Sequence, residues 1–210
     1  MKLTVLGATG GTGQQLARQA IAAGHEVTVI VRRPEAIPDP GPQLRVVRGD
    51  LLDPQWTGEG IDGAEAVLSA LGATERGPTT LYSAGTAAVL KAMDNAGVRR
   101  ILVVGATPAG PHDQQSGFNK VVVFPILWKF FGGLYEDMRR MEQILAASDT
   151  DWTVVRPPRL TNGPLTGHAR TAIGKPLPGG RVVSRADLAA AVLAAIDDRA
   201  TVRQAVAIAR

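Results

Sequence analysis

The stretch LGATGGTG, residues 6–13, constrains the fold of this chain more than any other feature. It places four glycines between an apolar run, residues 2–6, and a segment with apolar residues at helical spacing, residues 12–24. Glycines there allow a tight strand-to-helix turn and close approach of the backbone to a ligand. The first turn of a helix also presents unpaired N–H groups and a positive dipole end, which favour phosphate. This context predicts a phosphate-binding loop rather than an ordinary turn.

The alternation of strand-like and helix-like segments continues along the chain. Further strands are expected at 25–33, 44–53, 64–72, 98–106, 151–158 and 205–209, and further helices at 79–97, 133–148 and 184–198. Ser184 and Asp187 open the last helix with capping-box spacing. Strands that are apolar almost throughout, alternating with helices, indicate a parallel sheet covered on both faces. The expected fold is therefore α/β, a doubly wound and mainly parallel sheet.

One domain over residues 1–210 is the simplest account of this pattern, because no repeat or low-complexity linker interrupts the chain. Two segments, at about 108–134 and 157–183, lack a clear period and are expected to be irregular. We expect both to lie over the carboxyl edge of the sheet.

Composition excludes several function classes. The chain has no cysteine, which excludes disulfides, thiolate metal sites and a cysteine nucleophile, and no metal site is expected. The net charge is +4 and the basic residues are scattered apart from three arginine pairs, so nucleic-acid binding is not expected. No signal peptide is recognised, and the longest apolar stretch, residues 121–134, is too short to span a bilayer. These features predict a cytoplasmic protein without a membrane span.

The residues after the second expected strand predict which dinucleotide binds. Sites for NAD place Asp or Glu there, whereas a nearby Arg accommodates the 2′-phosphate of NADP. Here Arg32 and Arg33 follow the strand, and the first acidic residue is Glu35. A guanidinium can bind phosphate through two hydrogen bonds, whereas a carboxylate would repel it. The sequence therefore predicts NADP(H).

Ligands of such sheets lie beyond the carboxyl ends of the strands, so several strand ends should form one cleft. The expected cofactor contacts in the loop and at these ends are Gly7, Thr9, Gly10, Gly11, Thr12, Gly13, Arg32, Arg33, Asp50, Leu51, Ala70, Leu71, Gly72, Ala106 and Thr107. Asp50 and Leu51 are expected to face the adenine, and Ala106 and Thr107 the nicotinamide. A purely turn-forming role is the alternative for Asp50.

Several stretches together resemble a known group of proteins. TVLGATGGTG, VRRPE, VRGDLLD, RRILVVGAT and DWTVVRPPRLTNGPLTG are similar to the atypical short-chain dehydrogenase/reductases, in the branch of biliverdin-IXβ/flavin reductases and NmrA-like proteins. The likeness runs over nearly the whole chain, and RPPRLTNGPLTG and SRADLA are its more branch-specific parts. It implies a Rossmann fold, NADP(H) binding and a small C-terminal substrate lobe. It also implies that Pro157, Pro158 and Arg159 lie near the nicotinamide, and that acceptors are planar tetrapyrroles, flavins or quinones.

The chain departs from the standard short-chain dehydrogenases at the catalytic pair. Those enzymes place a Lys four residues after a Tyr, where it lowers the phenol pKa and allows proton transfer. Here Thr86 holds that position after Tyr82, and Arg139 holds it after Tyr135. The usual Ser after the fifth strand is also missing, and Thr107 is the nearest hydroxyl. These differences disfavour alcohol and ketone chemistry and are compatible with hydride transfer to an acceptor whose anion is delocalised.

Three residues are candidates for a catalytic role: Thr107 as a hydrogen-bond donor, Arg159 as a partner for an anionic substrate, and Tyr135, whose phenolate Arg139 could hold. The predicted function is NADPH-dependent hydride transfer to a planar conjugated acceptor such as a flavin, quinone or tetrapyrrole. One alternative is a non-catalytic, NmrA-like sensor of NADP(H). Another is an enzyme similar to sugar-nucleotide epimerases.

The apolar segment 118–135 contains most of the aromatic residues of the chain. Loops at the carboxyl ends of strands form substrate pockets, so a flat acceptor could stack on these rings. An apolar interface in a homodimer is the other interpretation. The sequence leaves both open.

Overall fold

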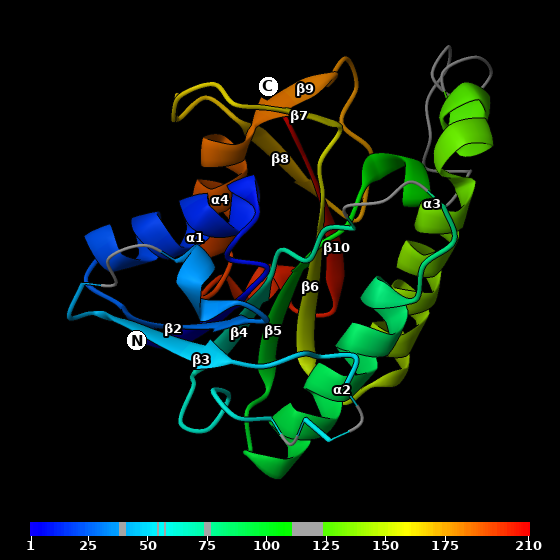
Figure 1. Ribbon diagram of the computed structural model, residues 1–210. Helices are drawn as coiled ribbons and strands as arrows, with labels where there is room; N and C mark the ends of the chain where they lie inside the picture. The colour runs from blue at the N-terminus through cyan, green and yellow to red at the C-terminus, as the bar shows by residue number, and fades with distance from the viewer. Residues whose placement is uncertain (38–40, 54, 57, 74–76, 111–123) are drawn as a thin grey trace.

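A computed structural model describes residues 1–37, 41–53, 55–56, 58–73, 77–110 and 124–210 of the protein. One sheet runs through it (Figure 1), in the order β3 (Leu44–Arg48), β2 (Glu26–Val31), β1 (Lys2–Leu6), β4 (Ala66–Ser69), β5 (Arg100–Val104), β6 (Asp151–Arg156), β10 (Gln204–Ala209) and β8 (Arg170–Ile173). Neighbouring strands are parallel except β8, which is antiparallel to β10. An order that runs outward from β1 in both directions is that of the Rossmann fold, so the predicted fold class is confirmed.

Helices cover both faces of the sheet. They are α1 (Gly11–Ala22), α2 (Leu81–Asn95), α3 (Phe124–Ala147) and α4 (Arg185–Ala194). α1 and α4 pack against each other on one face, and α2 and α3 pack against each other on the other (Figure 1). In β1, Leu3 and Val5 belong to the core under α1 and α4, whereas Leu6 belongs to the core under α2 and α3. Successive strand residues point to opposite faces, so a sheet buried on both sides requires strands that are apolar throughout.

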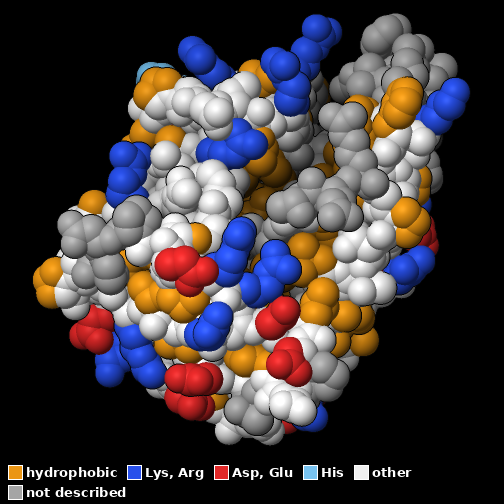
Figure 2. All heavy atoms as spheres, in the orientation of Figure 1, with side chains coloured by type: hydrophobic (Ala, Val, Ile, Leu, Met, Phe, Trp, Pro, Cys, Tyr) orange, Lys and Arg blue, Asp and Glu red, His pale blue; other side chains and the backbone are white. Residues whose placement is uncertain are grey.

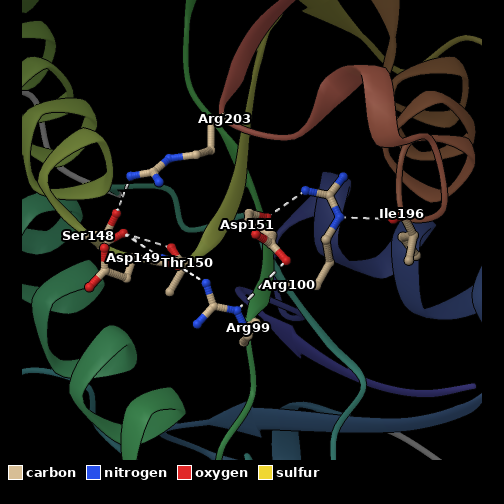
Figure 3. A network of polar contacts seen from close by, with 8 residues as sticks. All are labelled: Arg99, Arg100, Ser148, Asp149, Thr150, Asp151, Ile196 and Arg203. Atoms are coloured by element: carbon tan, nitrogen blue, oxygen red, sulfur yellow. Dashed lines mark hydrogen bonds and ion pairs between the residues drawn. The ribbon is translucent and has the colours of Figure 1, made fainter.

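The amino-terminal edge of the sheet is closed by polar contacts around Arg100, the first residue of β5 (Figure 3). Its Nε donates to the carbonyl oxygen of Ile196 at 2.9 Å, and its Nη1 donates to the carbonyl oxygen of Asp151 at 2.6 Å. Nη2 donates to the carbonyl oxygen of Ala195. Ala195 and Ile196 follow α4, and the last carbonyls of a helix lack partners inside it. Arg100 therefore caps α4 and fixes the helix to the sheet.

α3 is longer than the sequence indicates. Residues 108–134 were expected to be irregular, but the helix already begins at Phe124, so this expectation is wrong for its last part. Pro125 lies in the first turn, where a missing N–H removes no bond of the helix. Gly133 serves packing rather than termination, because a Cβ there would lie 2.9 Å from the Cα of Pro78. Glycine thus lets α3 approach the residues that precede α2.

The region between β6 and α4 contains more regular structure than expected. Between residues 157 and 184 the chain forms β8 and two short strands, β7 (Arg159–Thr161) and β9 (Val182–Ser184). β7 and β9 pair in parallel and form a second, two-stranded sheet. Long-range pairing between short segments leaves little periodicity in the sequence, which is why it was missed.

The predicted cap of α4 is confirmed. The Ser184 hydroxyl oxygen accepts from the N–H of Asp187 at 2.9 Å. The Asp187 carboxylate in turn accepts from the N–H of Thr166 at 2.7 Å and of Gly167 at 3.0 Å. Burial alone would raise the pKa of Asp187, but the hydrogen bonds from Thr166, Ser184 and Gly167 lower it below its usual value. One buried carboxylate therefore joins the start of α4 to the loop that precedes β8.

Candidate functional site

A cleft of about 780 Å³ opens at the carboxyl ends of the strands. Figure 2 shows a hollow between the side of the molecule that carries α4 and the side that carries α3, with hydrophobic side chains inside it and basic side chains at its rim. The predicted site residues that line the cleft are Gly7, Thr9, Gly10, Gly11, Thr12, Arg32, Asp50, Leu51, Ala70, Leu71, Gly72, Ala106, Tyr135, Pro157 and Pro158. The structure thus brings these residues to one place, and their contact with a cofactor stays a prediction.

The remaining predicted residues, Gly13, Arg33, Thr107 and Arg159, do not line this cleft. Gly13 is buried beneath the loop, and Arg33 is exposed just before the 3₁₀ turn η1 (Pro34–Ala36). Thr107 begins the turn η2 (Thr107–Ala109), and its hydroxyl donates to the carbonyl oxygen of Arg156 at 3.1 Å. Arg159 is exposed at the start of β7. The roles of these residues also stay predictions.

The glycine-rich loop is shaped by two close backbone approaches. Gly7 has φ +74°, and a Cβ there would lie 2.3 Å from the carbonyl oxygen of Ala70 at the end of β4. A Cβ on Gly13 would lie 2.2 Å from the carbonyl oxygen of Gly7. No side chain fits at either contact, so these glycines press the loop onto the sheet and α1 onto the loop.

The first turn of α1 offers donors to an anion. The first bond of the helix runs from the N–H of Gln14 to the carbonyl oxygen of Gly10 at 2.9 Å, which leaves the preceding N–H groups without an intrahelical partner. No acidic residue occurs in this turn, and its residues Gly11 and Thr12 line the cleft. Free N–H groups at a positive dipole end are suited to phosphate, so the residues present fit a pyrophosphate.

Basic charge lies at the end of β2, as the sequence predicts. Arg32 is exposed at the rim of the cleft, and neither its side chain nor that of Arg33 has a hydrogen bond or ion pair with any residue that the structure describes. Asp50 is the one carboxylate among the described lining residues. Its Oδ1 accepts from the N–H of Leu52 at 3.0 Å, so the turn-forming role of Asp50 is confirmed.

One wall of the cleft is apolar and aromatic. This aromatic wall consists of Tyr82 of α2 and of Phe131, Leu134, Tyr135 and Met138 of α3. The ring centroid of Tyr135 lies 6.3 Å from that of Phe131 and 5.6 Å from that of Trp128. Phe130, by contrast, is 62% exposed. The helical part of segment 118–135 thus presents rings to the cleft and one ring to the outside, and Phe118 lies outside the described residues.

Tyr135 is not paired with Arg139, which corrects the sequence-based expectation. Arg139 Nε donates to the carbonyl oxygen of Ala109 at 3.0 Å, and its guanidinium lies 4.3 Å from the ring centroid of Trp128. Burial, with a smaller contribution from Tyr82, raises the pKa of Tyr135, whereas a nearby cation would lower it. Tyr135 is therefore a neutral phenol at physiological pH.

A buried carboxylate that sequence reasoning missed orders this wall. Asp137 of α3 is completely buried. Its Oδ2 accepts from the N–H of Tyr82 at 2.9 Å and of Ser83 at 3.3 Å, and its Oδ1 accepts from the Ser83 hydroxyl. These are N–H groups of the first turn of α2, so α3 supplies the N-terminal cap of α2. No spacing in the sequence links position 137 to positions 82 and 83.

Tyr82 and Arg185 are further lining residues that were not predicted. The Tyr82 hydroxyl accepts from the N–H of Ala73 at 3.1 Å. Burial raises the pKa of Tyr82, the hydrogen bond from Ala73 lowers it, and the charge of Asp137 raises it further, with a net increase. Arg185 stands in the SRADLA stretch, whose branch-specific character was the available signal for a functional residue.

Other candidate chemistry is sparse in the described part of the chain. There, no group of three or more His, Asp or Glu residues is arranged to hold a metal ion. No helix of that part is long and apolar enough to cross a membrane. His168 is exposed, and His112 lies outside the described residues.

A Rossmann sheet with a glycine-rich turn into α1 and a cleft over the strand ends defines a dinucleotide-binding protein. Residues 7–199 match the model of the NAD(P)H-binding family, and the chain belongs to this family.

Curated relatives cover different shares of the chain. A 3-diazoavenalumate denitrifying reductase of a Streptomyces species is 31% identical over 96% of this chain and 74% of its own length. The uncharacterized sugar epimerase YhfK of Bacillus subtilis (strain 168) is 27% identical over 98% of this chain and 92% of its own length. The chain spans less than two thirds of two other relatives. The uncharacterized protein YwnB of Bacillus subtilis (strain 168) is 31% identical over 50% of this chain and 47% of its own length. The uncharacterized chloroplastic protein At2g34460 of Arabidopsis thaliana is 28% identical over 80% of this chain and 62% of its own length.

Solved structures share the fold over the whole chain. A protein of Burkholderia pseudomallei is 28% identical with a TM-score of 0.79 and full coverage of both chains. The anaerobilin reductase ChuY of Escherichia coli O157:H7 is 21% identical, with a TM-score of 0.81 and coverage of 100% and 97%. A short-chain dehydrogenase/reductase of Veillonella parvula DSM 2008, solved with NADP, is 19% identical, with a TM-score of 0.80 and coverage of 100% and 94%. At such low identity the last two show the fold alone.

Proposed function

We propose that this protein is an NADPH-dependent reductase that transfers hydride to a planar conjugated acceptor such as a flavin, a quinone or a tetrapyrrole. The observation that carries the proposal is a single cleft with two unlike halves. One half is lined by the first turn of α1, with its free N–H groups, and by Arg32. The other half is lined by the aromatic wall. The first half suits a phosphorylated dinucleotide and the second suits a flat apolar ring system.

The cofactor half favours NADPH over NADH. The guanidinium groups of Arg32 and Arg33, after β2, have no partner in the described part of the chain, and a guanidinium binds phosphate through charge-assisted hydrogen bonds. The Veillonella protein of the same fold was solved with NADP, which agrees with this preference. When bound, NADPH supplies the hydride, and the side chains of the cleft hold it in place and exclude water.

The acceptor half favours a planar partner. Phe131 and Tyr135 offer ring surfaces, and Leu134 and Met138 complete an apolar lining. ChuY, named as an anaerobilin reductase, and the Streptomyces relative, named as a reductase, are compatible with reduction of such a partner. Pro157 and Pro158, at the end of β6, would bound the space between the two halves.

Tyr135 is the proposed proton or hydrogen-bond donor to the acceptor. Its hydroxyl has no hydrogen-bond partner among the described residues, and its raised pKa keeps the proton on Oη. Arg159, exposed after Pro158, is proposed to hold an anionic substituent of the acceptor. Thr107 can take part only if its hydroxyl exchanges its bond to Arg156 for one to a ligand.

The test is NADPH oxidation at 340 nm with a panel of FMN, a soluble quinone and biliverdin, and NADH as the matched control. We expect at least one acceptor to be reduced, and much faster with NADPH than with NADH. Tight NADPH binding without reduction of any acceptor would contradict the enzyme proposal.

That last outcome would support a second candidate function, a sensor that binds NADP(H) without catalysis. The observation in its favour is that no described residue places a cation in contact with Tyr135, because Arg139 contacts Ala109 and Trp128 instead. An epimerase-like activity, suggested by the name of YhfK, is the weaker alternative, and conversion of a sugar nucleotide without net NADPH consumption would identify it.

Location and assembly complete the proposal. We place the protein in the cytoplasm, which cell fractionation tests. A homodimer through segment 118–135 is supported by the exposed Phe130 on α3. Light scattering of the wild type and of Phe130→Ser would test it, and a monomer in both would contradict it.

A further inference from the structure

Arg185, the first residue of α4, lies directly on the glycine-rich loop. A Cβ added at Gly11 would stand 2.9 Å from Cδ of Arg185 and 3.1 Å from its Nε. Arg185 also lines the cleft. The side chain therefore extends from α4 to the first turn of α1, where the free N–H groups are, and a larger residue at position 11 would displace it.

The Arg185 side chain is held at both ends. Its backbone stands next to Ser184, whose hydroxyl caps α4 through the N–H of Asp187. Its Nη1 donates to Oδ1 of Asn162 at 2.6 Å. Asn162 follows β7, so the guanidinium is oriented by the region beyond β6 rather than by α1.

Most donors of this guanidinium have no partner among the residues that the structure describes. Arginine has five N–H donors, and the bond to Asn162 uses one. No carboxylate among the described residues pairs with Arg185, because Asp187, the acid nearest in sequence, accepts from Ser184, Thr166 and Gly167 instead. A partly buried cation with free donors beside a positive helix end calls for an anion with several oxygens.

We propose that Arg185 binds the pyrophosphate of the dinucleotide beside the first turn of α1, with Asn162 as its positioning residue. This inference rests on the proposed function, since it assumes that NADP(H) occupies the cleft. It separates two cationic subsites: Arg32 and Arg33 for the 2′-phosphate, and Arg185 for the pyrophosphate that NADPH and NADH share. An acidic group of the acceptor is the other anion that Arg185 could meet, and the experiment distinguishes the two.

Binding is measured by calorimetry without any acceptor, for NADPH, NADH, ADP-ribose and adenosine 2′-monophosphate. In Arg185→Gln, we expect the first three to bind more weakly by a common factor of about 10-fold or more, because each contains the pyrophosphate. Adenosine 2′-monophosphate lacks it and should bind as to the wild type. Arg32→Ala is the matched control and should show the reverse, with losses only for the two ligands that carry a 2′-phosphate.

Two further variants test the contact itself. Arg185→Lys keeps the charge without the planar fork, so its losses should be intermediate. Gly11→Ala places a methyl group against Cδ and should weaken NADPH binding in the wild type. In an Arg185→Ala background it should add little, because alanine lacks the Cδ and Nε atoms that the methyl group meets. Additive losses would contradict the contact.

The outcomes separate this inference from the proposed function. Failure of the wild type to bind NADPH or NADH overturns both. Unchanged dinucleotide binding in Arg185→Gln, with unchanged melting temperature, overturns the inference alone. If that variant instead raises only the KM of a carboxylate-bearing acceptor, Arg185 meets the acceptor, and the pyrophosphate assignment is wrong.

Discussion

Two arginine pairs lie at opposite ends of the sheet, and their surroundings differ. Arg99 and Arg100 stand at the amino-terminal edge, around the start of β5, whereas Arg32 and Arg33 follow β2 at the carboxyl edge. The Arg100 side chain donates to three carbonyl oxygens and two threonine hydroxyls, a network seen in part in Figure 3. Arg32 and Arg33 have no such partner among the described residues.

The comparison shows how position along a strand separates two uses of the same side chain. At the amino-terminal edge, loops and helix ends present carbonyl oxygens, and Arg100 donates hydrogen bonds to them and so stabilises the fold. At the carboxyl edge, the helices that follow the strands begin, and their free groups are N–H donors rather than acceptors. The side chains of Arg32 and Arg33 have no protein acceptor among the described residues and are left available to an anion. The following predictions test this division.

The largest effect is expected at Arg100. Arg100→Met removes the donors to the carbonyl oxygens of Asp151, Ala195 and Ile196, so the free energy of unfolding should fall by about 3 kcal/mol. Urea denaturation measures it. Arg99→Ala is the control: this mostly exposed side chain should contribute about 0.5 kcal/mol. Equal losses in the two variants would contradict the structural role of Arg100.

The opposite behaviour is expected at Arg32 and Arg33. Replacing both by Ala should weaken NADPH binding by about 1.5–3 kcal/mol per lost charge-assisted hydrogen bond and leave NADH binding and stability nearly unchanged. Fluorescence titration with both cofactors measures the difference. Equal weakening of NADPH and NADH would refute the 2′-phosphate assignment.

Tyr135 tests the aromatic wall. Tyr135→Phe should lower turnover by roughly 10- to 100-fold with little change in NADPH affinity, because it removes the proposed donor and keeps the ring. Since burial raises the pKa of Tyr135, wild-type turnover should not fall from loss of this proton below about pH 10. Tyr82→Phe, which removes a hydroxyl already bonded to Ala73, should change turnover much less. Equal turnover in Tyr135→Phe and the wild type would exclude Tyr135 as the donor.

Asp187 sharpens the comparison, because it is a charged residue near the carboxyl edge whose carboxylate accepts hydrogen bonds from the protein itself. Its pKa is lowered in the folded state, so its stabilising effect is present above the usual carboxyl pKa and is lost as the pH falls through the folded value. Asp187→Asn should therefore destabilise the protein by about 1 kcal/mol at pH 7 and progressively less in acid. Thermal melts of both proteins across this pH range measure it. A pH-independent difference would contradict the assigned cause.

The sequence predicted those features that local backbone chemistry determines. Gly7 and Gly13 marked the loop because no other residue fits the positive φ of Gly7 or the close contact at Gly13. The strand ends at Arg32 and Asp50 were predictable because parallel strands place their carboxyl ends at one edge.

The sequence missed what only tertiary packing creates. The early start of α3 was hidden because the stretch before residue 133 shows no clear period in the sequence. Arg139 follows Tyr135 at the spacing of a catalytic Lys, but its guanidinium contacts Trp128 and the carbonyl oxygen of Ala109 rather than the Tyr135 hydroxyl. Asp137 was not singled out, because its partners, Tyr82 and Ser83, lie on another helix.

The carboxylate of Asp137 also has a consequence for the order of folding. It bonds to N–H groups 54 and 55 residues earlier in the chain, so the first turn of α2 lacks its cap until α3 has docked. Contacts of such sequence separation form late, because a long loop must close first. The amide protons of Tyr82 and Ser83 should therefore exchange with solvent whenever α3 detaches. They provide a natural probe for the opening of the wall on which the acceptor is proposed to lie.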